Sequence, residues 1–363
     1  MDIPSSVSAI TAPWLNQALE ANGVEHPGVA NLTTSPMPGI VGALGEVGIV
    51  DIEWAGPTDL PASMVAKCPL DDEMARLYNS VLRTYVREAG FYRDLADEVP
   101  MRVPKCFVNA ESDDQSAHML LIEKIDGVDG NIFDEPTFET MVELVSKMAT
   151  MHGQFWMSDQ LLSIDWMLDW QTESFKLGIP ITQDAWATFQ AAEPNTYSAA
   201  LADFCKKSWI DDTEFWLDQY CDRPWTFTHI DYELDNMVHT DTETVVLDWQ
   251  TCLRSFPGVD LAWLLASSET EETVARESEL IDLYRSTLEA SGGPSWSHDD
   301  VIEELAWGTL YPAACQPVPN VNAADAEGEA GERMKARFRA FLERSLRAAE
   351  RWDLVGHCSP HLR

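Results

Sequence analysis

The stretch THIDYELDNMVHTDTETVVLDWQ, residues 228–250, decides how this chain is interpreted. It contains His229, Asp231 and Asn236 in the pattern H-x-D-x-x-x-x-N, and the apolar run at 245–247 leads to a single carboxylate, Asp248. Phosphoryl transfer from ATP requires this set of groups: a carboxylate beside the acceptor hydroxyl, then an amide oxygen and a second carboxylate to hold Mg²⁺. The stretch therefore predicts a protein that moves a phosphate.

Each residue type suits one part of that chemistry. Asp231 would accept or orient the proton of the attacking hydroxyl. Asn236 offers a neutral oxygen and Asp248 a charged one, and Mg²⁺ is a hard cation that binds oxygen. Residues 237–239 and 244–247 are typical of a β-hairpin, which would carry Asn236 and Asp248 back to the same end. The H-x-D-x-x-x-x-N pattern alone is only moderately specific, and the hairpin behind it makes the interpretation much more so.

Composition favours a folded chain of two lobes and excludes some partners. The chain has 363 residues, of which 45% are hydrophobic, so it is long for one small core and can bury a sizeable interior. Its net charge of −37, from 24 basic and 61 acidic residues, argues against nucleic acid and anionic membranes as partners. A solvated acidic surface accounts for this charge, and attraction of a cationic substrate is the alternative.

Cysteine usage and the N-terminal segment favour a cytoplasmic protein. The seven cysteines are widely spaced and form no C-x-x-C pair, so neither a zinc site nor a disulfide framework is indicated. The segment MDIPSSVSAITAPWLNQ has no basic region and no long apolar core, so we expect no signal peptide. No run of residues approaches the length of a membrane span. The sequence indicates no oligomeric state.

Hydrophobic periodicity predicts an α+β chain with a small sheet lobe and a larger, mostly helical lobe. We expect a short helix at 9–23, strands at 48–54 and 63–68, a helix at 73–98, strands at 103–110 and 118–123, and a loop at 323–331. The expected lobes are residues 1–122 and 131–363, and the Gly- and Asp-containing segment 123–130 would link them.

The sheet lobe supplies further candidates. Gly39, Gly42, Gly45 and Gly48 recur just before a strand, and such a turn either approaches phosphates closely or is an ordinary hairpin loop. Lys67 is the only lysine among residues 1–100 and lies inside an apolar strand, where an unpaired ammonium is costly, so it needs an anion such as a phosphate or a glutamate. The alternative is a lysine at a strand edge that extends to water.

Taken together, the motifs of residues 45–265 resemble the aminoglycoside phosphotransferase and choline kinase group, most closely its ecdysteroid-kinase-like branch. The resemblance rests on GALGEVGIVDIEW (42–54), MVAKCP (64–69), REAGFY (87–92), VPKCFV (103–108), LLIEKIDG (120–127), MATMHGQFW (148–156), THIDYELDN (228–236), VVLDWQ (245–250) and PGVDLAWLL (257–265), in the order of that family. It implies a protein-kinase-like bilobal fold. The chain departs from many relatives at Ile230, where they have glycine.

The resemblance also implies a role for each candidate residue. Asp231 would be the catalytic base, with Asn236 and Asp248 as metal ligands and His229 and Asp260 as supports of the same loop. In the sheet lobe, the residues implied to contact ATP or its anchor are Gly42, Gly45, Lys67, Glu88, Glu123, Lys124 and Ile125. Lys67 would pair with Glu88, and the backbone of 123–125 would hold adenine. The implied cofactors are ATP and Mg²⁺.

The acceptor is expected to be a hydroxyl of a small molecule. Only residues 249–259 separate Asp248 from Asp260, which leaves no room for the activation loop of a protein kinase. Tryptophans between 156 and 225, with Asp165 and Asp169, form either an acceptor site or helix core. Arginines between 333 and 351 form either an anion site, as a hydroxyacyl substrate would need, or a self-paired solvated face. A nucleotide-binding pseudokinase is the alternative from another class.

Overall fold

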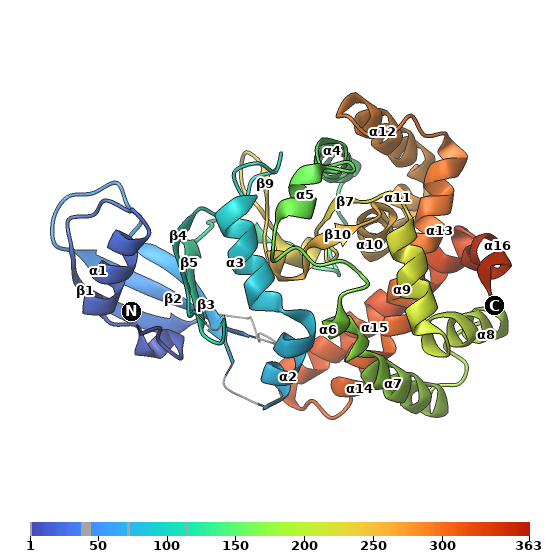
Figure 1. The fold of residues 1–363 in the computed structure, drawn as a ribbon, viewed down its shortest axis with the longest axis horizontal. Coiled ribbons are helices and arrows are strands. Elements are labelled where there is room, and N and C mark those ends of the chain that lie inside the picture. Colours follow the sequence, from blue (N-terminus) through green and yellow to red (C-terminus); the bar gives the residue numbers. More distant parts are fainter. Residues whose placement is uncertain (1, 38–44, 71–72, 114) are drawn as a thin grey trace. The chain divides into compact units, whose positions relative to one another are not determined.

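The computed structural model describes residues 2–37, 45–70, 73–113 and 115–363 (Figure 1). The chain forms two compact units. The first contains Met1–Val128 and Val238–Thr251, and the second contains Asp129–Met237 and Cys252–Arg363.

The first unit is built around strands. Its elements are η1 (Val7–Ala9), α1 (Ala12–Ala21), β1 (Val29–Pro36), β2 (Gly45–Trp54), β3 (Ser63–Pro69), α2 (Glu73–Leu82), α3 (Thr84–Asp94), β4 (Cys106–Glu111), β5 (His118–Glu123), β9 (Thr244–Val246) and η4 (Trp249–Thr251). The short strands β6 (Val128–Asp129) and β8 (Met237–His239) lie where the chain passes from one unit to the other. The strands predicted in the sheet lobe are therefore confirmed.

Strands β1 to β5 form one antiparallel sheet in the order β1-β2-β3-β5-β4. Side chains alternate between the two faces of a strand, so Met64, Ala66 and Cys68 of β3 face the core that includes Trp14 and Leu15 of α1. The other face buries Val65, Leu120 and Ile122, against which Tyr92 of α3 packs. Lys67 follows the parity of Val65, so β3 presents it to the face that α3 covers.

The helix predicted at 73–98 is interrupted. Arg83 has φ of +50°, so it cannot continue a right-handed helix, and the segment divides into α2 and α3 at this residue. Glu88, one of the candidate site residues, therefore lies on the separate helix α3, which begins at Thr84.

The second unit is mostly helical. Its elements are α4 (Phe138–Gln154), α5 (Asp159–Ser163), α6 (Glu173–Lys176), α7 (Ile179–Ala192), α8 (Ala199–Cys205), a π-helical turn η2 (Lys206–Ile210), α9 (Thr213–Asp222), β7 (Thr226–Thr228), η3 (Leu234–Asn236), β10 (Leu253–Ser255), α10 (Gly258–Ser267), α11 (Glu271–Ala275), α12 (Glu277–Ala290), α13 (His298–Cys315), α14 (Pro317–Asn322), α15 (Gly328–Arg351), α16 (Leu354–Cys358) and η5 (Ser359–His361). The loop expected at 323–331 is shorter, because α15 begins at Gly328.

Helices α10 and α13 pack closely in the second unit because glycine occupies the contact. A Cβ on Gly308 would lie 2.0 Å from the backbone oxygen of Gly258, and a Cβ on Gly258 would lie 2.2 Å from the backbone oxygen of Glu304. This approach places α10, which carries Asp260, against the hydrophobic core of the unit. Within the described residues, no helix is long and apolar enough to cross a membrane.

Candidate active site

In the first unit, Lys67, Glu88 and Asp248 form one ionic cluster. The Lys67 ammonium donates to Glu88 Oε1 at 2.6 Å and to Asp248 Oδ1 at 2.8 Å. The side chain of Lys67 is 14% exposed and that of Glu88 is fully buried. The pairing of Lys67 with Glu88 was implied by the family resemblance, whereas the contact with Asp248, 181 residues away along the chain, was not.

Burial and charge act on this cluster in opposite directions. Burial would lower the pKa of the Lys67 ammonium, but the carboxylates of Asp248 and Glu88 raise it above its ordinary value. The pKa of the Glu88 carboxyl is also raised, because its burial outweighs the attraction of Lys67. The ammonium therefore stays charged near neutral pH, and it has anionic partners in a setting where an isolated charge would be costly.

Helix α3 fixes the segment that follows Asp248. Phe91 stacks on Trp249 with ring centroids 4.0 Å apart and an interplanar angle of 5°. Arg87 Nη1 donates to the backbone oxygen of Thr251 at 2.8 Å. Asp248 has φ of +60°, so its backbone adopts the left-handed region, which is uncommon for a non-glycine residue. The helix that carries Glu88 thus also holds the residues next to Asp248.

The remaining candidates of the first unit are not members of the Lys67–Glu88–Asp248 cluster. Gly42 lies outside the described residues. Gly45 has a packing reason to be glycine, because a Cβ there would lie 2.0 Å from the Tyr85 hydroxyl. Glu123 ends β5, and its N–H donates to the backbone oxygen of Lys105 at 2.8 Å. Its neighbours 124–125 continue towards β6, and Lys124 pairs with Asp126 at 2.7 Å.

In the second unit, Asp231 and Asn236 contact each other directly. The Asn236 Nδ2 donates to Asp231 Oδ2 and to the Asp231 backbone oxygen, both at 2.9 Å. Residues 234–236 form the short 3₁₀ turn η3, which brings Asn236 back to Asp231 within five residues. The spacing of the H-x-D-x-x-x-x-N pattern is therefore the spacing of one compact loop.

Asp260, at the start of α10, anchors that loop. Its buried carboxylate accepts the backbone N–H of His229 at 2.8 Å and that of Ile230 at 2.6 Å. It also bonds His152 Nε2 at 3.2 Å, and His152 Nδ1 bonds the Tyr284 hydroxyl at 2.9 Å. The family resemblance implied that Asp260 supports the loop, whereas the contact between His152 and Asp260 could not be predicted from the sequence.

Ile230 has an unusual backbone for its type. Its φ is +72°, although a β-branched residue is strongly disfavoured in the left-handed region, and its side chain is 4% exposed. The family resemblance already indicated that this position departs from a glycine. The structure supplies a physical reason for that glycine, since glycine takes this conformation without strain.

Sequence reasoning missed the cation beside the loop. Arg337 of α15 forms ion pairs with Glu233, which directly precedes η3, and with Asp235, which lies within η3. Burial raises the pKa of the Glu233 carboxyl to about 8 despite Arg337, and the nearby charges of Asp231 and Asp235 act in the same direction as burial. The available signal was the arginine content of residues 333–351, which did not indicate a partner.

Several arginines of α15 bind groups that are distant in sequence, and only part of the helix pairs with itself. Arg347 and Arg351 both pair with Glu269, at 2.6 and 2.8 Å. Arg344 Nη1 donates to the backbone oxygen of Ile132 at 2.7 Å. The local pair expected on a solvated helix is present for Lys335 and Glu332, and Arg339 combines a local partner, Glu343, with Glu193 at the end of α7.

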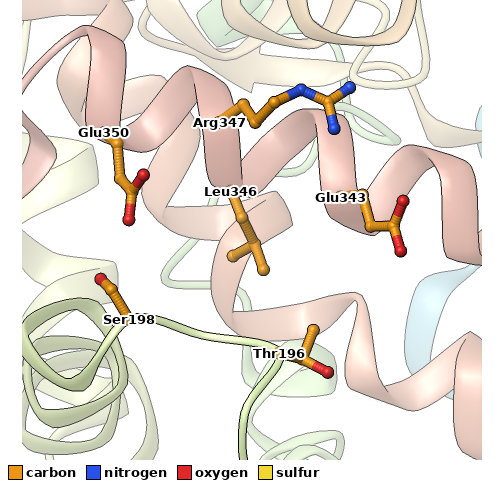
Figure 2. Close-up of a pocket in the computed structure, with 6 residues that line it drawn as sticks. All are labelled: Thr196, Ser198, Glu343, Leu346, Arg347 and Glu350. Carbon is orange, nitrogen blue, oxygen red and sulfur yellow. The ribbon is translucent and has the colours of Figure 1, made fainter.

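The suggested acceptor residues are mostly structural. The tryptophans at 166, 170, 186, 209 and 216 are at most 4% exposed, so they form helix core. Asp169 forms an ion pair with Arg254, so its charge already has a partner. A hollow of about 220 Å³ is lined by Thr196, Ser198, Glu343, Leu346, Arg347 and Glu350 (Figure 2). Its wall includes Arg347 but neither the tryptophans nor the aspartates suggested for the acceptor.

Comparison with known proteins gives a family and a fold. The model of the phosphotransferase enzyme family matches residues 72–293. No curated protein sequence matches the chain. A putative aminoglycoside phosphotransferase from Ralstonia eutropha superposes with a TM-score of 0.56 at 14% identity, covering 94% of this chain and 97% of that one. Choline kinase from Cryptosporidium parvum gives 0.53 at 13%, covering 88% and 90%. The microcompartment-associated aminopropanol kinase gives 0.52 at 14%, covering 96% and 99%. These likenesses confirm the α+β, protein-kinase-like bilobal fold.

Proposed function

We propose that this chain, which belongs to the phosphotransferase enzyme family, transfers the γ-phosphoryl group of ATP to a hydroxyl of a small molecule, with Mg²⁺. Family membership confirms the resemblance to aminoglycoside phosphotransferases and choline kinases and makes the chain a phosphotransferase; the ecdysteroid-kinase-like branch stays a prediction. The observation that carries the proposal is the Lys67 ammonium, which is held at a defined position by Glu88 and Asp248. A fixed, charged lysine of this kind is what anchoring a phosphate requires.

The first unit would bind the nucleotide. Glu88 would orient Lys67, the backbone of 123–125 would hold adenine, and Gly42 and Gly45 would be near the phosphates. The Lys67 ammonium, which pairs with Glu88 and Asp248, would supply positive charge to phosphate oxygens. Asp248 would be one of the residues that hold the metal, which would neutralise charge on the phosphates. Residues 1–122, 123–130 and 131–363 would then be the nucleotide lobe, the linker and the acceptor lobe.

The donors at 236 and 248 suit Mg²⁺. The Asn236 amide nitrogen donates to Asp231, so its oxygen faces away from that residue. The Asp248 carboxylate accepts hydrogen bonds from Lys67 and Gln250, and a carboxylate oxygen can bind more than one partner. In the part of the chain that the structure describes, no three His, Cys, Asp or Glu residues form a metal cluster. Mg²⁺ typically takes one or two protein oxygens and completes its shell with phosphates and water, where it neutralises developing charge.

Asp231 would act on the acceptor. Its carboxylate is oriented by Asn236 Nδ2, and its loop is held by the two backbone bonds to Asp260. A carboxylate fixed in this way can align the acceptor hydroxyl and accept its proton as the phosphoryl group is transferred. His229 supports the loop through its backbone N–H, which donates to Asp260. Catalysis then depends on positioning and electrostatics.

For the acceptor, we propose a neutral or weakly cationic hydroxyl compound. The arginines 337, 344, 347 and 351 already bind carboxylates or carbonyl groups, which weakens the case for an anionic hydroxyacyl substrate. The solved structures named for aminoglycosides, choline and aminopropanol are kinases of amino alcohols, in agreement with this choice. Steroid- and macrolide-like alcohols belong in the same screen as neutral acceptors with an apolar ring system.

The test is a transfer assay with purified protein, [γ-³²P]ATP, Mg²⁺ and a panel of hydroxyl compounds. Asp231→Asn should retain ATP binding and lose about 10²- to 10⁴-fold in turnover, the usual contribution of a positioned base. Asp241→Asn, an exposed residue of the nearby β8–β9 turn, is the matched control and should be unaffected. Nucleotide binding without transfer to any acceptor would support the pseudokinase alternative, and normal turnover of Asp231→Asn would remove Asp231 from the mechanism.

A further inference from the structure

Arg337 lies about one hundred residues from the catalytic loop in sequence and binds it directly. Its Nη2 donates to Glu233 Oε1 and its Nε to Asp235 Oδ2, 104 and 102 residues away. Both carboxylates belong to the six-residue segment 231–236. Because the planar guanidinium presents its donors in a fixed fork, it can hold two side chains of one loop at a set separation.

The segment 231–236 concentrates three carboxylates, which repel one another unless a cation offsets their charge. Asp231, Glu233 and Asp235 alternate along it, and the side chain of Glu233 is only 3% exposed. Burial would lower the pKa of the Arg337 guanidinium, yet Glu233, Asp235 and Asp231 together raise it. A buried carboxylate whose cation is removed is strongly destabilised. Arg337 thus offsets the negative charge of the segment that contains Asp231.

A chain of hydrogen bonds connects Arg337 to the reactive groups. The Glu233 N–H donates to the Asp231 backbone oxygen, and the Asn236 N–H donates to the Glu233 backbone oxygen, both at 3.0 Å. Asp235 Oδ1 accepts the N–H of Ile132 at 2.6 Å. Glu233 is therefore bonded through its backbone to both Asp231 and Asn236, and its side chain is held by Arg337.

A second arginine of α15 reinforces the same contact. Arg344 is seven residues beyond Arg337, two helical turns along the same face, and it donates to the backbone oxygen of Ile132. The N–H of Ile132 in turn binds Asp235. Helix α15 thus binds the loop directly, through Arg337 and the two carboxylates, and indirectly, through Arg344 and the backbone of Ile132.

We propose that Arg337 is a positioning residue for phosphoryl transfer: by binding Glu233 and Asp235 it fixes the loop that presents Asp231 and Asn236. This proposal rests on the proposed function for the roles of Asp231 and Asn236. It gives helix α15 a part in the reaction although none of its residues needs to touch the substrate.

The experiment compares Arg337→Gln with Arg339→Gln. Arg339 is the matched control, since it is on the same helix, is 38% exposed against 33% for Arg337, and also pairs with two carboxylates, Glu193 and Glu343. Arg337→Gln should lower kcat about 10- to 100-fold, the usual effect of losing a residue that orients a reactive group, with KM for ATP changed less than about 3-fold. Arg339→Gln should retain kcat. Arg337→Lys keeps the charge without the fork, so its kcat should lie between wild type and Arg337→Gln.

Hydrogen–deuterium exchange of the peptide covering 229–237 gives a readout that does not need activity. Exchange should rise in Arg337→Gln and stay at the wild-type level in Arg339→Gln. If Arg337→Gln does not fold, Arg337→Lys carries both measurements. Wild-type kcat in a folded Arg337→Gln or in Arg337→Lys would overturn the proposal, and so would unchanged exchange in 229–237. A wild-type protein that transfers phosphate to no acceptor would count against the proposed function, and the exchange measurement would still decide the effect of Arg337 on the loop.

Discussion

Replacing Ile230 separates the strain of its backbone from the packing of its side chain. Ile230→Ala and Ile230→Gly both remove a side chain that is 4% exposed, so each should lower the free energy of unfolding by about 2–5 kcal/mol. The two variants differ only in the Cβ atom. At φ of +72° that Cβ is unfavourable by about 1–2 kcal/mol, whereas glycine adopts the conformation freely.

We therefore expect Ile230→Gly to be more stable than Ile230→Ala by about 1–2 kcal/mol, reversing the usual order of the two residues. Thr228 in β7 is the matched control: it is buried two residues earlier, and it is not among the described non-glycine residues with positive φ. There, Thr228→Gly should be less stable than Thr228→Ala by about 0.5–1 kcal/mol.

Urea unfolding measures both differences. With a urea dependence of about 1–3 kcal/mol per M, a difference of 1 kcal/mol moves the midpoint by about 0.3–1 M, which is readily resolved. The bonds from the 229 and 230 backbone to Asp260 should persist in Ile230→Gly, because glycine keeps both N–H groups. If alanine is as stable as glycine at 230, or if both positions show the same order, Ile230 is not strained and the reasoning is refuted.

Three further predictions concern the nucleotide, the metal and the acceptor. Lys67→Ala should weaken ATP binding about 10- to 100-fold, because one charge-assisted contact is lost, while adenosine should bind as it does to wild type. Calorimetry measures both affinities, with Lys105→Ala as the control. Loss of adenosine binding as well would show that Lys67 has a structural role. Asp248→Ala should abolish the Mg²⁺ dependence of ATP affinity, with Asp241→Ala as control, and an unchanged metal effect in the titration would locate the metal elsewhere. Raising the salt concentration should lower kcat/KM for a cationic acceptor and leave a neutral ring compound nearly unaffected; an anionic acceptor with the highest efficiency in the screen would contradict our choice.

Much of the first unit could be predicted from short-range pattern. Alternation in β3 gives Lys67 the same parity as Val65, and the apolar residues of β2 and β5 mark the strands that flank it. The family resemblance then gave Glu88 as the partner of Lys67, and the structure has that ion pair. Its second partner, Asp248, was predicted only as a metal ligand, because nothing in a local pattern indicates which residue 181 positions away will approach.

Interpretation of the aromatic and basic residues required the fold. The sequence could not distinguish an acceptor pocket from helix core for the tryptophans near 166–216, since both need large apolar side chains; burial decides for core. The interruption at Arg83 was missed because an arginine has no intrinsic tendency to end a helix, and only its φ of +50° shows the break.

The proposed roles of Asp231 and Asn236 could be predicted from the sequence, because these two residues lie within a short spacing. Asp231 and Asn236 are five residues apart, and one turn suffices to make them meet. Only the tertiary structure decided what holds that loop in place: Asp260 at about thirty residues and Arg337 at about one hundred. Ion pairs and buried hydrogen bonds form wherever packing brings donors and acceptors together, and packing depends on the whole arrangement of helices, which no local period encodes.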